Sequence, residues 1–227
     1  MKIGILGTGM VGRVIAEALV NKGHEVMLGT RDKSKTSNST EKGIYGQDSF
    51  SEWSSKNPKI NLGNFSECMI FGEILMNATS GLASMNALEL GKAETVGTKT
   101  LIDIANKLDF SKGMPPVTLA NDISPSLAEE IQTKYPNLNV VKSLSTMNAL
   151  VMVNANLVSG GDSTVFLSGN SDKAKEDTKM ILKEFGWTDI FDLGDIKTSR
   201  GVEMLLPFWI NIWQKLGTTP FNYKIQR

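Results

Sequence analysis

The stretch Ile3–Gly12 reads I-G-I-L-G-T-G-M-V-G and combines a buried strand with a glycine motif. Its apolar part, Ile3–Leu6, has the length of a buried parallel strand, and the G-x-G-x-x-G that follows opens a helical pattern. Gly7 makes the tight turn, Gly9 lets a pyrophosphate approach the backbone because it has no Cβ, and Gly12 lets the helix pack closely on the strand. This order predicts a dinucleotide site. A glycine-rich turn in another α/β fold is the alternative.

The composition is that of an ordinary globular protein. The chain has 227 residues, 41% hydrophobic and 21% charged, which is enough for one large domain or for one domain with a small second unit. Lys and Arg number 24, as do Asp and Glu, so the charge balance gives no support for nucleic acid or a membrane as partner. The single cysteine, Cys68, and the single histidine, His24, exclude an internal disulfide and a cysteine metal cluster. We expect a cytoplasmic protein without a metal site.

Strands and helices alternate along the first part of the chain, which predicts a parallel sheet with helices on both faces. The expected strands are Ile3–Leu6, His24–Thr30, Lys59–Leu62, Ile74–Ala78, Thr100–Ala105 and Val140–Leu144. The expected helices are Met10–Lys22, a short helix capped by Asn64 or Ser66, Ala83–Leu90 and Ser126–Tyr135, while the polar stretch Arg31–Lys42 is expected to be a loop.

The end of the second strand carries the signal for cofactor choice, because a carboxylate there selects NAD whereas a small polar residue followed by Arg makes room for the 2′-phosphate of NADP. The chain reads Thr30-Arg31-Asp32 at this point. Asp32 has the spacing of a ribose ligand, but the strand register favours Thr30, with Arg31 over the phosphate and Lys33 or Lys35 adding charge. The sequence favours NADP(H).

The pattern changes after about residue 155. A strand at Ser163–Ser168, a helix at Asp172–Phe185 and a strand at Asp189–Asp192 precede a long apolar helix at Thr198–Leu216. The predicted fold is therefore α/β, with a doubly wound parallel-sheet Rossmann domain over residues 1–155 that binds NADP. A small C-terminal α/β extension over residues 156–227 is expected to supply the acceptor pocket and a dimer contact.

The last helix is too apolar to face water on a small unit. Plain core packing would explain its apolar stripe, but a dimer interface or a ring-binding pocket needs the same property. We therefore expect a homodimer.

Five motifs spread over nearly the whole chain resemble one known family, the NADP oxidoreductases that depend on the deazaflavin coenzyme F420. They are Gly7–Gly12, Gly29–Asp32, Ile102–Phe110, Val141–Ala149, and Ser199–Glu203 with Leu206-Pro207. The resemblance implies a site in which Thr8, Met10 and Val11 cradle the pyrophosphate beside the glycines. It also implies 2′-phosphate contacts from Thr30, Arg31 and Lys35, and a nicotinamide flanked by Ala78, Thr79, Met147, Asn148 and Ala149.

The resemblance also implies an acceptor pocket that contains Ser145 and Thr146. The archaeal family members have a histidine at the position of Ser145, and a serine is shorter and cannot carry charge. We expect binding of the deazaflavin F420 to be weaker here, or a flavin to replace it as co-substrate.

The implied reaction is hydride transfer between NADP(H) and a small-molecule redox acceptor of the deazaflavin or flavin type, which requires little acid–base chemistry from the protein. Two alternatives stay open. A β-hydroxyacid or imine reductase begins with the same glycine motif, but it needs a proton donor on a large helical second domain. A non-catalytic NADPH-binding module would need no catalytic residues at all.

Overall fold

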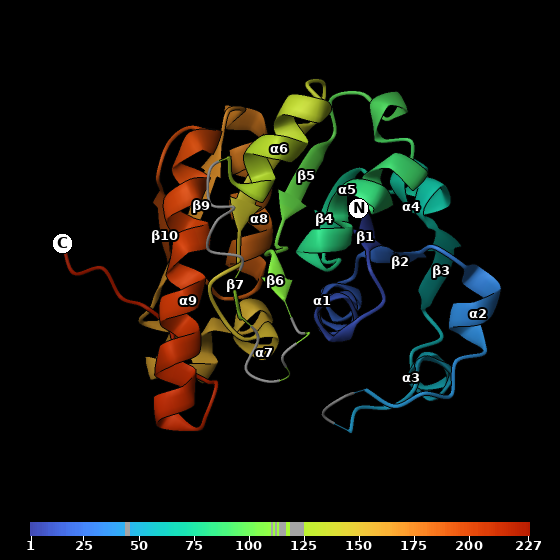
Figure 1. Cartoon of the computed structure of the whole chain (residues 1–227), viewed down its shortest axis with the longest axis horizontal. Coiled ribbons are helices and arrows are strands. Elements are labelled where there is room, and N and C mark those ends of the chain that lie inside the picture. The colour runs from blue at the N-terminus through green and yellow to red at the C-terminus, as the bar shows by residue number, and fades with distance from the viewer. Residues whose placement is uncertain (44–45, 110, 112, 114–116, 119–124) are drawn as a thin grey trace.

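The protein is described by a computed structural model over residues 1–43, 46–109, 111, 113, 117–118 and 125–227. Within these residues, an eight-stranded sheet has the order β10-β9-β8-β5-β4-β1-β2-β3 (Figure 1). The strands are β1 (Lys2–Leu6), β2 (Glu25–Thr30), β3 (Ile60–Asn64), β4 (Ile74–Asn77), β5 (Thr100–Asp103), β8 (Asn139–Ser143), β9 (Thr164–Gly169) and β10 (Asp189–Asp192).

The strands from β3 to β8 are all parallel. From β1 the chain adds β2 and β3 on one side and β4, β5 and β8 on the other, so the strand order reverses between β1 and β4. Ligands of open α/β sheets bind outside the carboxyl ends of the strands at such a reversal. The glycine motif follows β1 directly, so the topology places it at this position. The predicted doubly wound α/β fold is confirmed.

Helices cover both faces of the sheet, and each face has its own hydrophobic cluster. On β1, Ile3 and Ile5 belong to one cluster and Leu6 to the other, which explains why this strand is apolar without alternation. The first face packs against α1 (Met10–Asn21), α3 (Phe50–Lys56), α7 (Ala149–Val153) and α8 (Asp172–Glu184); the second packs against α4 (Phe65–Phe71), α5 (Gly81–Leu90) and α6 (Leu127–Lys134).

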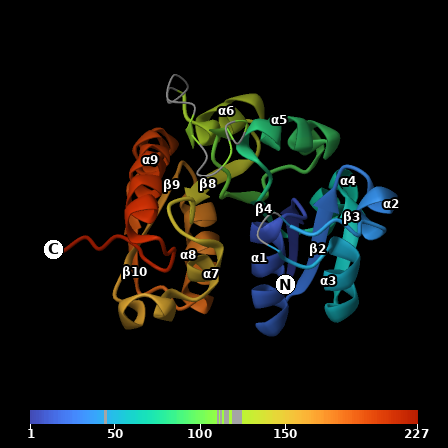
Figure 2. The same cartoon turned by 60° about the horizontal axis from the view of Figure 1, so that its bottom comes forward.

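The C-terminal strands extend the same sheet. β9 pairs antiparallel with β8, and β10 pairs parallel with β9, so one antiparallel neighbour interrupts the expected parallel order. The long helix α9 (Ser199–Leu216) packs against β9, on the opposite side of the molecule from β3 in both views (Figure 1 and Figure 2). A short antiparallel pair, β6 (Leu108–Asp109) and β7 (Val117–Thr118), stands apart from the main sheet. The domain boundary at residue 155 stays a prediction.

One local prediction is wrong, and one helix was not predicted. The stretch expected as a loop contains helix α2 (Lys33–Ser37), because the Asp32 carboxylate caps it by accepting a hydrogen bond from the Lys35 backbone N–H. Helix α3 was not predicted, although Ser49 and Glu52 form a capping box at its start. At α4 the cap is Asn64 rather than Ser66. Phe110, the last residue of one family motif, lies outside the described residues.

Candidate functional site

The three glycines of the motif occupy three different environments. Gly7 has φ +113°, and a Cβ there would lie 2.6 Å from the Ala78 carbonyl oxygen on the neighbouring strand connection. A Cβ on Gly12 would overlap the carbonyl oxygen of Gly7, so α1 can lie this close to the loop only if residue 12 is glycine. A Cβ on Gly9 would meet no atom of the described residues within 4 Å. The fold therefore requires Gly7 and Gly12, whereas it leaves room beside Gly9.

The open side of Gly9 faces a cavity. Gly9 is the N-cap residue of α1 and offers no side-chain cap to the first turn of that helix. The first turn also has no acidic residue, so the positive end of the helix dipole is uncompensated there. Such a helix start is a ready site for phosphate groups.

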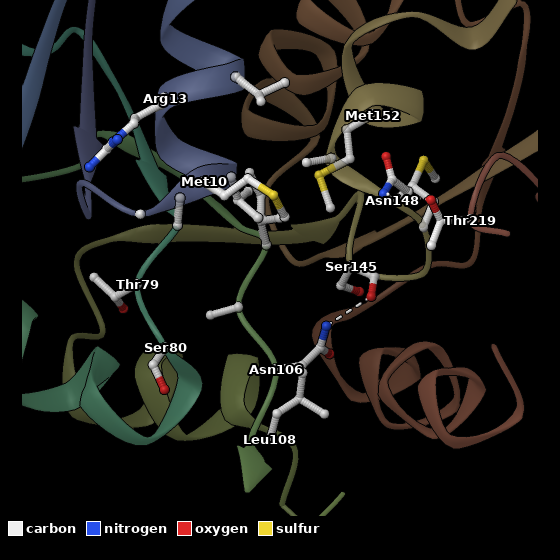
Figure 3. Close-up of a pocket in the computed structure, with 18 of the residues that line it drawn as sticks. Met10, Arg13, Thr79, Ser80, Asn106, Leu108, Ser145, Asn148, Met152 and Thr219 are labelled. Carbon is white, nitrogen blue, oxygen red and sulfur yellow. Dashed lines mark hydrogen bonds between the residues drawn. The ribbon is translucent and has the colours of Figure 1, made fainter. Parts of the chain in front are cut away.

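The cavity has a volume of about 890 Å³ and runs from the glycine loop past the carboxyl ends of β4, β5 and β8 to helix α9 (Figure 3). The predicted site residues that line it are Gly9, Met10, Val11, Ala78, Thr79, Ser145, Met147, Asn148 and Ala149. The predicted residues outside its lining are Gly7, Thr8, Gly12, Thr30, Arg31, Lys35 and Thr146. The cavity thus brings together all of the expected nicotinamide residues, part of the expected pyrophosphate set and one of the two expected acceptor residues. The expected 2′-phosphate residues lie beyond its lining.

The end of β2 carries the groups expected to select the cofactor. Thr30 is buried, and its Oγ1 lies 2.7 Å from Thr36 Oγ1. The Asp32 carboxylate caps α2, and its Oδ1 lies 2.9 Å from the backbone nitrogen of Lys35. Arg31 is exposed, and its guanidinium has no hydrogen bond or ion pair within the part of the chain that the structure describes. Arg31 is thus available to an anion, whereas Asp32 already has a partner.

Arg13 is a cavity residue that the sequence interpretation did not single out. Its Nε donates to the Thr8 carbonyl at 2.9 Å, and its Nη1 donates to the Asp48 carbonyl at 2.7 Å. The guanidinium also lies 5.2 Å from the Phe50 ring and 5.5 Å from the Trp53 ring. Burial lowers the pKa of Arg13 against the opposing effect of the Asp48 charge. Arg13 holds the glycine loop against helix α3. Its place directly after the last glycine of the motif was the available signal.

The far end of the cavity contains buried polar atoms without partners. Asn106 donates through Nδ2 to the Ser145 carbonyl at 2.8 Å, which fixes its amide (Figure 3). Among the described residues, no partner is found for Asn106 Oδ1, Ser145 Oγ or Trp209 Nε1. Ser145 is 2% exposed and Trp209 7% exposed, so bulk water does not satisfy these groups. A bound molecule with polar atoms on its edge fits this end of the cavity.

Helix α9 forms the wall at this end. Leu206, Trp209, Ile210 and Trp213 line the cavity from that helix. The Trp209 ring stacks on Phe221 at a centroid distance of 5.0 Å, so the C-terminal segment supports the wall from behind. The sequence marked α9 as apolar but could not indicate which of its residues face the cavity.

The described residues contain neither a cluster of metal ligands nor a helix that could span a membrane. No group of His, Cys, Asp and Glu side chains there is arranged to hold a metal ion. None of the helices combines the length and hydropathy that crossing a bilayer requires.

Comparison with known proteins gives consistent matches. A family model described as NADP oxidoreductase coenzyme F420-dependent matches residues 2–107. A solved structure from Arthrobacter sp. FB24, of a protein described as a candidate F420-dependent NADP-reductase, is 47% identical, covers 100% of both chains and has a TM-score of 0.91.

More distant relatives share parts of their length with this chain. The metalloreductase STEAP3 of Rattus norvegicus is 25% identical over 215 residues, which is 92% of this chain but 38% of STEAP3. An imine reductase from Streptomyces aurantiacus is 16% identical, with a TM-score of 0.60, and the match covers 97% of this chain and 69% of that one. The likeness to the imine reductase shows the fold alone.

Proposed function

Since this chain belongs to the NADP oxidoreductase family that is described as coenzyme F420-dependent, we propose that it transfers hydride between NADP(H) and a deazaflavin or flavin. One observation carries the choice of a ring-shaped acceptor. The cavity continues from the glycine loop to a second end, where Ser145 and Trp209 present polar atoms that have no partner in the described part of the chain, beside apolar walls. Such a mixture of apolar surface and a few polar atoms suits a planar heteroaromatic ring.

The residues present fit NADP(H). The backbone beside Gly9 leaves room for a pyrophosphate at the start of α1. Arg31 offers a guanidinium that has no partner among the described residues at the end of β2, while Asp32 is engaged as a helix cap. In this assignment Thr30, Arg31 and Lys35 hold the 2′-phosphate, and the nicotinamide lies between Thr79 and the start of α7.

Bound NADPH supplies the hydride, so the protein has to bind, orient and shield the two rings. Arg13, Glu17 and Asp48, the charged residues in the cavity lining, belong to α1 and the segment before α3. The described lining residues around Ser145 are all uncharged. An uncharged end matches hydride transfer between two rings, because this reaction needs no side chain to protonate a carbonyl or an imine.

Oxidation of NADPH by a panel of F420, FMN and ferric chelates tests the proposal. Turnover with F420 or FMN is the expected result. Ser145→His then tests the placement of the acceptor, because the added imidazole should raise F420 reduction. Leu150→His is the matched control, since it adds the same group on exposed α7 surface outside the cavity lining. Equal effects of the two variants would remove Ser145 from the acceptor pocket.

The panel also separates the alternatives. NADPH binding without turnover by any acceptor would favour a non-catalytic NADPH-binding module. Reduction of cyclic imines instead would favour an imine reductase, the class with which this chain shares its fold.

Homodimer formation and a cytoplasmic location belong to the same proposal. Phe208 and Met204, on the outer side of α9, are 56% and 53% exposed, whereas Trp209 is buried within its own chain. Exposed apolar side chains on one helix favour contact with a second copy. Sedimentation velocity of the native chain and of Phe208→Glu tests this; a monomeric native chain at micromolar concentration would contradict it.

A further inference from the structure

A fully buried lysine lies behind the cavity, where hydride transfer does not require it. Lys142, on the central strand β8, is 0% exposed. Its Nζ lies 2.9 Å from Asp103 Oδ2 and 3.0 Å from Glu203 Oε1, and it also donates to the Ala105 carbonyl. Burial lowers the pKa of Lys142, but the two carboxylates outweigh this effect and raise it, while burial raises the pKa of Asp103. One cation thus joins β5, β8 and α9.

The cluster continues to the opposite wall of the cavity. Asp103 Oδ1 accepts from Asn77 Nδ2 at 2.7 Å, and Asn77 Oδ1 accepts from Thr79 Oγ1 at 2.7 Å. Thr79 lines the cavity at its nicotinamide side, and Asn77 is 0% exposed. An unbroken series of hydrogen bonds and ion pairs therefore connects Thr79, through Asn77, Asp103 and Lys142, to Glu203 on α9.

Glu203 connects α9 to the start of α6, four residues before the proline of α9. Its carboxylate also accepts from the Leu127 backbone N–H at 3.0 Å, at the start of α6. Pro207 stands one turn later inside the helix, and since it has no N–H the Glu203 carbonyl has no helical partner. The helix is weakened just after its anchor, and Trp209 and Ile210, which line the cavity, come next. The side chain of Glu203 is thus one of the contacts that hold α9 beside the cavity, together with the Arg200–Glu129 pair.

Stability alone does not account for such a cluster. In many buried ion pairs the free-energy cost of desolvating the charged groups exceeds the gain from their attraction. Apolar side chains of similar volume often stabilise a fold as well or better. A charged cluster does, however, fix one geometry, because each of its groups loses much if any partner moves.

We propose that Lys142 is a positioning residue that sets the separation between the Thr79 wall and the α9 wall, and hence the fit of the acceptor against the nicotinamide. This inference rests on the proposed function, because it requires an acceptor between the two walls. Hydride transfer depends steeply on the distance between the reacting rings, and a misplacement of 1 Å can cost about 100-fold in rate.

Two variants of the cluster and one control test the proposal. Glu203→Gln keeps an oxygen for Leu127 but removes the charge that attracts Lys142; Lys142→Met removes the link altogether. The control is Arg200→Gln, which breaks the bidentate Arg200–Glu129 contact, at 2.7 Å for both bonds, and so loosens α9 from α6 without touching the series of bonds to Thr79. All three are assayed as full-length chains with F420 and FMN.

The expected result separates the acceptor step from nucleotide binding. Glu203→Gln should lower kcat/KM for the acceptor about tenfold, and Lys142→Met, where it folds, roughly 10- to 100-fold, while calorimetry gives an unchanged Kd for NADP⁺. A larger primary isotope effect with deuterated NADPH should accompany the loss. Amide hydrogen exchange supplies a readout without turnover: Glu203→Gln should loosen both residues 78–80 and residues 208–212, whereas Arg200→Gln should leave 78–80 unchanged.

Three results would overturn the inference. Equal kinetic losses in Glu203→Gln and Arg200→Gln would mean that any loosening of α9 has the same effect. An unchanged exchange rate at residues 78–80 in Glu203→Gln would mean that the two walls are not coupled. A native chain that binds NADPH but reduces no acceptor would refute the proposed function first, and the positioning role with it.

Discussion

Replacing Gly9 by alanine should abolish nucleotide binding without harming the fold. The backbone at Gly9 has φ −73° and ψ −177°, which alanine adopts freely, and a Cβ there lies more than 4 Å from every atom that the structure describes. Alanine lowers the entropy of the unfolded chain, which stabilises the fold, but it is a poorer N-cap than glycine, which destabilises it. The net change in unfolding free energy should therefore stay within about 1 kcal/mol. The new methyl group would project into the cavity, where the pyrophosphate is expected.

Thermal melts with and without NADP⁺ measure this effect. At a ligand concentration of about 100 times Kd, binding stabilises a folded protein by roughly 2.7 kcal/mol. Each kcal/mol raises the melting temperature of a chain of this size by about 2–4 °C, so the native protein should shift by roughly 5–11 °C. Gly9→Ala should melt within a few degrees of the native protein and should show no shift with NADP⁺.

Gly12→Ala is the informative comparison. Its Cβ would overlap the Gly7 carbonyl oxygen, so this variant should lose about 1–3 kcal/mol of stability even without ligand. The two glycines would then be separated experimentally, one needed by the fold and the other by the ligand. A full NADP⁺ shift in Gly9→Ala would refute the reasoning, because the loop would then have only a structural role.

Further outcomes follow from three other sites. Arg31→Ala should weaken NADPH binding by about tenfold, the lower end for a charged hydrogen bond since Arg31 is exposed, and leave NADH unchanged in calorimetry; equal native affinities for the two nucleotides would instead favour Asp32 as ribose ligand. The Arg200 hydrogen bonds hold the pKa of Glu129 below its usual value. The resulting stability is present above the ordinary glutamate pKa and is lost as pH falls through the lowered one, so urea midpoints should fall on acidification, less steeply in Arg200→Gln. Burial raises the pKa of the Cys68 thiol to about 12, so alkylation near neutral pH should require unfolding, and rapid labelling of the native chain would contradict this.

Much of the sheet could be predicted from the sequence because its information is local. The run Ile3–Leu6 is apolar on both faces, and the glycine motif fixes the turn after it, so strand, turn and helix follow from neighbouring residues. The helix at Lys33–Ser37 was missed for an equally physical reason: its residues have no apolar periodicity, and a single cap from Asp32 starts it. Propensity and periodicity do not detect helices of this length.

The site divides in the same way. Its nucleotide half lies on consecutive residues of one loop, whereas the contact of Asn106 with Ser145 joins two strand ends that only the tertiary fold brings together. The antiparallel pairing of β8 with β9 was equally invisible, because nothing in either strand records the direction of its neighbour. Residue types can suggest such a pocket, but its composition depends on which strands are adjacent.

Lys142 shows that a local anomaly can still point to a distant partner. It stands in the run Val140–Ser143, which reads as a buried strand, and a charged side chain in such a strand is stable only with buried partners. The sequence therefore requires a counter-charge somewhere, but it does not say where. The structure supplies one carboxylate from the adjacent strand and a second from α9, which is how a single residue in the sheet comes to help hold a helix across the cavity.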